Sequence, residues 1–404
     1  MKSKILAIAL FSTTVAGVAL YPVYQSTGGV TPVKHNPLKI PATNLVANDS
    51  NRIDVVFVLD TTGSMSGLIQ AAKEKIWSIA TTMASANSAP EIRVGLVAYR
   101  DRGDAYVTKT IDLSSDLDTV YATLMDFQAK GGGDGPESVN QALNDAVEGM
   151  SWSQDKQAYK VVFLVGDASP HMDYQDDVKY PVSLAAAREK NIVINTIQAG
   201  SSSSTTKDWQ QIAQLGHGQY FQVGQSGNAV AIASPFDEEI AKLSKKLDDT
   251  RLYYGNEEEK ARQVKKIEST DKLHASASVE TRARRATFNA SKSGSVNFLG
   301  EGELVDDIGS GRVDLSSIKK DELPKSLQAL APAAQKAMVS EMAERRNELQ
   351  SGIRQLAEKR TKYLKKKVKD SGGAKDSLDE KVYSAIREQA GKLGMTYEKD
   401  SADY

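Results

Sequence analysis

The sequence predicts an α/β protein whose first half forms a doubly wound, mostly parallel sheet flanked by helices, followed by a mainly helical C-terminal region. Nearly unbroken apolar runs at 53–59 and 161–165 are typical of strands that are buried on both faces. Segments with helical spacing of apolar residues separate these runs. Because strands that alternate with helices pair in parallel, we expect a Rossmann-like arrangement.

Strands and helices are expected to follow one another regularly within residues 51–230. Strands are expected at 53–59, 92–99, 161–165, 192–197 and 219–223, and helices at 68–79, 117–127, 138–147, 184–190 and 206–215. In a sheet of this kind, ligands bind where the carboxyl ends of the strands meet. The loops that leave those ends are therefore the first place to look for function.

The C-terminal region is expected to be mainly helical in three parts. A helical extension is predicted at 235–270, and a small mixed segment, irregular or β-containing because of its glycines, at 271–330. A helical region is predicted at 331–395, with an apolar residue every seven positions (Met342, Leu349, Leu356 and Tyr363). Arg346 and Arg360 interrupt the neighbouring row, which favours packing within the chain over a coiled coil.

The N-terminus has the pattern of an export signal. Two lysines precede a short apolar run that ends near residue 22, which predicts a signal peptide or an N-terminal anchor at 1–22. A Gly-, Pro- and Asn-containing stretch at 23–50 reads as a flexible linker. We therefore expect an exported protein, periplasmic or secreted or anchored near a membrane by its N-terminus. A bacterial periplasm fits an exported chain without cysteine.

Composition excludes several classes of function. The 404 residues contain 51 Lys and Arg against 52 Asp and Glu, which gives a net charge of −1. This balance argues against a nucleic-acid-binding protein, which needs a basic excess. There is no cysteine, so disulfides and thiolate chemistry are excluded. The four histidines lack the spacing of a catalytic zinc site.

Three expected loops carry oxygen ligands. Asp60, Thr62 and Ser64 follow the first strand at alternate positions, Glu137 follows a glycine-rich stretch, and Asp167 follows the strand at 161–165. Carboxylate and hydroxyl oxygens suit hard cations such as Mg²⁺, Mn²⁺ or Ca²⁺. Each acidic residue alone could be a helix-capping or turn residue. Their joint position at one sheet edge favours a metal site.

These loops resemble those of von Willebrand factor type A domains. Asp60-Thr61-Thr62-Gly63-Ser64 is similar to the D-x-[ST]-x-S signature of their metal-ion-dependent adhesion site, and Asp134-Gly135-Pro136-Glu137 to the second metal loop of integrin β-subunits. The resemblance implies that Thr62, Ser64 and Glu137 bind the metal directly. It implies that Asp60 and Asp167 bind it directly or through water, and that Asp134 supports a neighbouring site or orients the loop.

The resemblance also implies binding rather than enzymatic turnover. In this family the cation keeps one coordination position open, and the carboxylate of a protein partner completes it. We therefore expect a cell-envelope adhesion or assembly module that needs Mg²⁺, Mn²⁺ or Ca²⁺. Two alternatives stay open. One is a magnesium-dependent phosphotransferase of the haloacid-dehalogenase type with Asp60 as nucleophile. The other is a structural envelope protein that acts through its helical tail.

Overall fold

The computed structural model describes residues 51–133, 135–228 and 232–397. The predicted signal or anchor at 1–22 and the linker at 23–50 lie outside the described residues, as does Asp134. Within the described ranges, no helix has both the length and the apolar character needed to cross a bilayer.

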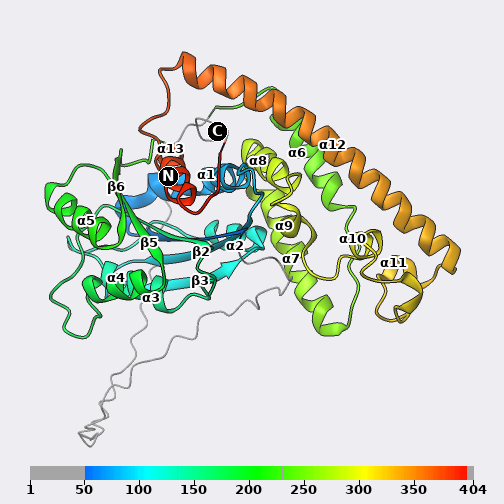
Figure 1. The fold of residues 1–404 in the computed structure, drawn as a ribbon, viewed down its shortest axis with the longest axis horizontal. Coiled ribbons are helices and arrows are strands. Elements are labelled where there is room, and N and C mark those ends of the chain that lie inside the picture. The colour runs from blue at the N-terminus through cyan, green and yellow to red at the C-terminus, as the bar shows by residue number, and fades with distance from the viewer. Residues whose placement is uncertain (1–50, 134, 229–231, 398–404) are drawn as a thin grey trace, which may run out of the picture. The chain divides into compact units, whose positions relative to one another are not determined.

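Six strands form a single mixed sheet, which confirms the predicted fold class (Figure 1). They are β1 (Arg52–Asp60), β2 (Glu91–Tyr99), β3 (Thr108–Ser114), β4 (Tyr159–Gly166), β5 (Ile192–Ala199) and β6 (His217–Val223). The spatial order is β3-β2-β1-β4-β5-β6. All neighbouring strands pair in parallel except β2 and β3, which are antiparallel. The carboxyl ends of β1 and β4 are therefore neighbours.

The edge strand β3 was not predicted from the sequence. Its apolar residues Ile111 and Leu113 are buried, whereas Lys109 is exposed and Thr110 half-buried. A half-buried strand alternates polar and apolar residues and lacks the continuous apolar run of a central strand. The sequence of β3 therefore gives a weaker strand signal than the central strands do.

Successive residues of β1 face two separate cores because side chains alternate across a strand. Phe57 and Leu59 pack with α1 (Ser66–Ala84) and α2 (Leu117–Leu124). Val56 and Val58 pack on the opposite face with α3 (Val139–Glu148), α4 (Tyr180–Glu189) and α5 (Ser203–Leu215). The sheet is thus covered on both sides, as a parallel sheet requires.

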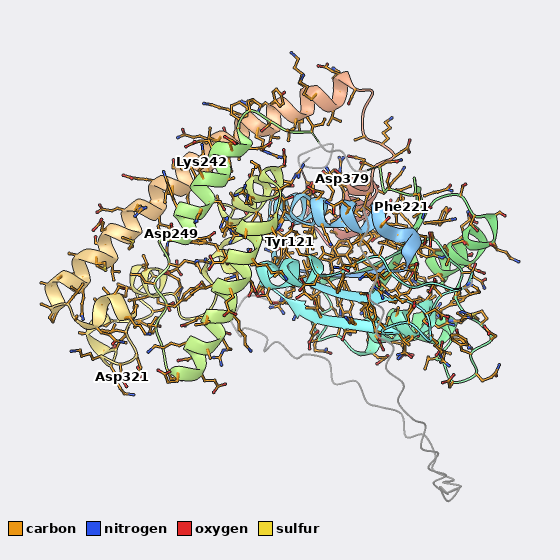
Figure 2. All side chains as sticks on the ribbon, turned by 180° about the vertical axis from the view of Figure 1, so that it is seen from behind. Tyr121, Phe221, Lys242, Asp249, Asp321 and Asp379 are labelled. Atoms are coloured by element: carbon orange, nitrogen blue, oxygen red, sulfur yellow. The ribbon has the colours of Figure 1, made fainter. Side chains whose placement is uncertain are left out.

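A helix from the far end of the chain completes one of these layers. Helix α13 (Leu378–Gly391) lies beside α1 on the sheet, and its Asp379 forms a buried ion pair with Lys75 of α1 at 3.1 Å (Figure 2). Gln389 accepts a hydrogen bond from the Tyr159 hydroxyl at 2.6 Å and donates one to Asn195 Oδ1 at 2.8 Å. The α/β unit therefore uses residues far beyond the predicted segment 51–230.

Helices also form the rest of the described C-terminal region. They are α6 (Asp237–Asp248), α7 (Glu257–Ser276), α8 (Val279–Asn289), α9 (Ser295–Leu299), α10 (Leu304–Gly309), α11 (Lys325–Gln328) and α12 (Pro332–Asp370). The expectation of β structure at 271–330 was wrong, since every regular element described there is helical. Glycines such as Gly300 and Gly302, both with positive φ, separate short helices rather than strands.

The two arginines that interrupt the apolar row of α12 point into the protein. Arg346 makes two hydrogen bonds of 2.8 Å to the carboxylate of Glu303, and Arg360 donates to Asp237 Oδ1 at 2.6 Å. Ile353 between them is fully buried. The row that contains the arginines is therefore the packed face, which agrees with the expectation of packing within the chain.

Candidate functional site

The first loop of the candidate site begins where β1 ends. The Asp60 side chain is buried, and its Oδ1 accepts hydrogen bonds from the Thr62 backbone N–H at 2.8 Å and the Thr62 hydroxyl at 2.7 Å. The Thr62 hydroxyl lies 3.4 Å from the Ser64 hydroxyl, and Ser64 is exposed. The three predicted residues of this loop are therefore adjacent and lead from the interior to the surface.

The second loop brings Glu137 next to Thr62. Gly63 N–H donates to the Gly131 carbonyl at 3.1 Å, which ties the two loops together. At Gly132, where φ is +80°, an added Cβ would lie 3.3 Å from Thr62 Cβ and 3.4 Å from Glu137 Oε1. Gly132 thus lies between Thr62 and the carboxylate of Glu137, and any side chain there would crowd both.

The third loop forms backbone hydrogen bonds with Glu137 and contains Asp167. Glu137 N–H donates to the Ser169 carbonyl at 2.9 Å, and His171 N–H donates to the Glu137 carbonyl at 3.1 Å. Asp167 Oδ2 accepts a hydrogen bond of 2.6 Å from the Gln225 side-chain amide, which also donates to the Ser64 carbonyl at 3.3 Å. Gln225 therefore links the first and third loops.

Buried carboxylates dominate the electrostatics of the candidate site. Burial, together with the nearby charge of Asp167, raises the pKa of Asp60 to about 7 despite three hydrogen bonds, two from Thr62 and one from the Asp167 backbone, that oppose the shift. The Asp60 Oδ2 atom is buried and has no hydrogen-bond partner among the described residues. Ionising Asp60 here is costly because no positive group offsets its charge.

Tyr99 at the end of β2 lies near these carboxylates; the sequence offers Tyr99-Arg100-Asp101 as a support of the metal face without a spacing that requires it. Its hydroxyl is buried and has no partner in the described part of the chain. Burial raises the pKa of this phenol most, and the charges of Asp60, Glu137 and Asp167 raise it further. All three carboxylates therefore lie close enough to influence the same hydroxyl. Its place at a strand end beside β1 was the available signal, but no spacing rule selects it.

Three neighbouring residues hold the glycine-rich loop and the third loop in place. Asp104 Oδ2 accepts a hydrogen bond of 3.1 Å from Gly132 N–H. Asp101 Oδ1 accepts one of 2.9 Å from the Ser138 hydroxyl, next to Glu137. The buried His171 ring stacks on Tyr174 with centroids 4.0 Å apart.

The set of donors consists of hard oxygens. Within the described ranges, no three His, Asp or Glu side chains lie close enough together to hold a metal ion by themselves. The candidate site differs from such clusters because two of its candidate ligands are the hydroxyls of Thr62 and Ser64. A cation here would need these neutral oxygens as well as the carboxylates.

Sequence comparisons identify the α/β unit. Residues 54–234 match the family model described as the von Willebrand factor A domain. A stretch of 119 residues is 27% identical to a putative ariadne-like RING finger protein of Acanthamoeba polyphaga mimivirus and covers 30% of this chain and 11% of that protein. A stretch of 123 residues is 28% identical to the α-protein kinase vwkA of Dictyostelium discoideum and covers 30% of this chain and 19% of that protein. The matches thus span a fifth or less of these relatives.

Solved structures show weaker similarity. Proximal thread matrix protein 1 from the mussel byssus is 16% identical with a TM-score of 0.34, covering 44% of this chain and 43% of that one. The SpRpn10 VWA domain is 13% identical, also with a TM-score of 0.34, covering 45% of this chain and 99% of that one. The family-model match at residues 54–234 thus covers most of the α/β unit, which is similar to the von Willebrand factor A domain in sequence.

Proposed function

We propose that the von Willebrand factor A domain of this chain is a protein-binding module that captures a carboxylate of its partner through a divalent cation, Mg²⁺ or else Mn²⁺ or Ca²⁺. The observation that carries the proposal is Asp60, a buried carboxylate that accepts a hydrogen bond from the Thr62 hydroxyl, has one oxygen without a partner among the described residues, and is close enough to Asp167 for that charge to raise its pKa. A divalent cation would supply the missing positive charge.

The residues of this chain would hold the ion and keep it reactive toward an anion. Thr62, Ser64 and Glu137 would bind it directly, and Asp60 and Asp167 directly or through water. The Asp60–Thr62 hydrogen bonds fix the Thr62 side chain, and Gln225 fixes Asp167. When bound, the cation would offer a partner carboxylate one open coordination position. Because two of its ligands are neutral hydroxyls, it would keep enough positive charge to attract one.

Binding is favoured over phosphotransfer by the state of Asp60. A nucleophilic aspartate must be able to reach its substrate. Asp60 is 1% exposed, and its Oδ1 already accepts two hydrogen bonds. These features suit a residue that supports a cation. The export signal predicted at 1–22 would place this binding outside the cytoplasm, in the cell envelope or beyond.

Calorimetric titration of the full chain with MgCl₂, MnCl₂ or CaCl₂ tests the proposal. Saturable binding of at least one ion is expected, with loss in Glu137→Gln and Thr62→Ala. Glu148→Gln, a half-exposed glutamate on α3, is the matched control and should bind like the wild type. Binding that survives in Glu137→Gln would contradict the proposed ligand set. Magnesium-dependent hydrolysis of p-nitrophenyl phosphate that disappears in Asp60→Asn would favour the phosphotransferase instead.

A further inference from the structure

The last turns of α12 carry an unusual concentration of positive charge. Between residues 359 and 369 the chain contains six lysines and no acidic residue, although its overall net charge is −1. All six lysines are exposed. Five of them, Lys359, Lys362, Lys365, Lys366 and Lys369, are here called the lysine face. This segment is the orange end of the long helix in Figure 1.

Helical geometry places the lysine face on one side of α12. At about 100° per residue, the five lysines fall within an arc of roughly 120° and extend over about 15 Å of the helix axis. The buried residues of the same turns, Arg360, Leu364 and Val368, lie on the opposite side. The five charges therefore point away from the protein and can meet a flat surface together.

The charge of the lysine face is not neutralised within the described part of the chain. None of its five lysines forms an ion pair or a hydrogen bond there, whereas Arg360 on the packed side is paired with Asp237. Lys367, which lies outside the arc, instead sits 5.6 Å from the centre of the Tyr363 ring. A helix C-terminus favours some positive charge, but this effect is confined to the last turn, and the lysine face extends over about three turns.

We propose that the lysine face binds an anionic lipid surface by electrostatic attraction. Each lysine held near such a surface strengthens binding by about fivefold, so a face that presents five together gives substantial affinity without inserting into the bilayer. The arc carries no apolar residue that could insert. Adsorption without insertion predicts strong dependence on salt, because surface attraction is screened within about 8 Å at physiological ionic strength.

A lipid surface fits these residues better than a nucleic acid does. Recognition of single strands uses aromatic rings for stacking and arginines for paired hydrogen bonds. The lysine face contains neither, and the one aromatic residue of the segment, Tyr363, is partly covered and packs edge-on against Phe236 at 6.5 Å. Lysines alone act as point charges, which suits a diffuse anionic layer.

Vesicle sedimentation tests this proposal independently of the cation site. The full chain is mixed with vesicles of phosphatidylcholine alone or with 30% phosphatidylglycerol, in EDTA, at about 100 mM and 500 mM salt. Binding is expected only with the vesicles that contain phosphatidylglycerol, and only at the lower salt concentration. The variant Lys359→Gln/Lys362→Gln/Lys366→Gln/Lys369→Gln should bind about 600-fold more weakly, since four contributions of about fivefold are removed.

A charge-matched variant separates the lysine face from net charge. Lys319→Gln/Lys320→Gln/Lys325→Gln/Lys336→Gln removes four other exposed lysines and should bind like the wild type. The proposal is overturned if the wild type ignores anionic vesicles, or if both variants lose binding equally. It is also overturned if the chain binds a single-stranded oligonucleotide at salt concentrations at which it does not bind the anionic vesicles. Circular dichroism confirms that both variants remain folded.

Discussion

At the scale of single residues, the candidate site depends on the buried carboxylate of Asp60 and its hydrogen bonds to Thr62. Asp60 can lie buried next to Thr62 because two hydrogen bonds hold its Oδ1 atom, while its Oδ2 atom lacks a partner among the described residues. The sequence predicted Asp60, Thr62 and Ser64 because their spacing is local. No spacing in the sequence selects Tyr99 or Gln225, because each reaches the site only through the pairing of distant strands and loops.

Gly132 provides a sharp test at this scale. Gly132→Ala would place a Cβ against Thr62 and Glu137 at a φ of +80°, at a cost of roughly 1–2 kcal/mol. We expect the loop to move away and cation affinity in calorimetry to fall by about tenfold. Gly133→Ala is the matched control, because its Cβ would meet no atom within 4 Å. Equal affinities in the two variants would show that the close approach at Gly132 is unimportant.

At the scale of elements, buried ion pairs join the helical region to the sheet. Arg285 of α8 bonds Asp118 of α2 at 2.5 Å and Asp248 of α6 at 2.7 Å. Burial alone would raise the pKa of Asp118, but Arg285 and Lys266 outweigh it and hold this pKa at about 2. The sequence could not reveal such pairs, since charged residues usually predict exposed faces.

This network predicts a pH dependence of stability. Because the pKa of Asp118 is lower in the folded chain than the ordinary 3.8, its contribution is complete above about pH 4 and is lost as pH falls toward 2. The contribution amounts to roughly 2 kcal/mol. In urea unfolding, Asp118→Asn should be less stable than the wild type at pH 6, and the difference should shrink at pH 3. A constant difference would contradict the assignment.

Helix α13 makes a second prediction at this scale. Ile386 is fully buried between α13 and the rest of the core, so Ile386→Ala should lower the free energy of unfolding by about 2–5 kcal/mol. Leu393 is 39% exposed, and Leu393→Ala should have little effect. Chemical denaturation of both variants measures the difference. Similar small losses in both would mean that α13 contributes little to the core.

At the scale of the whole molecule, the α/β unit is completed by residues far away in the sequence. The central strands were predicted from their apolar runs, and the domain matches a family model at 54–234. The role of α13 was not predictable, because its partners Lys75, Tyr159 and Asn195 lie about 190 to 300 residues away. Helical periodicity shows which face of α13 is apolar but not what covers it.

Removing the C-terminal region should therefore weaken the sheet. A fragment of residues 51–234 loses α13 and exposes the apolar face that this helix covers. We expect its melting temperature to lie more than about 10 °C below that of the full chain, since each lost kcal/mol costs about 2–4 °C at this size. Equal melting temperatures would mean that the domain is complete without the helix.

The central claim is that three loops at one sheet edge bind a divalent cation. The most direct measurement is a crystal structure of the full chain grown with MnCl₂, in which anomalous scattering locates the manganese. The account predicts a peak in contact with the Thr62 and Ser64 hydroxyls and the Glu137 carboxylate, next to Asp60 and Asp167. No peak at saturating manganese, or a peak away from these oxygens, would contradict it.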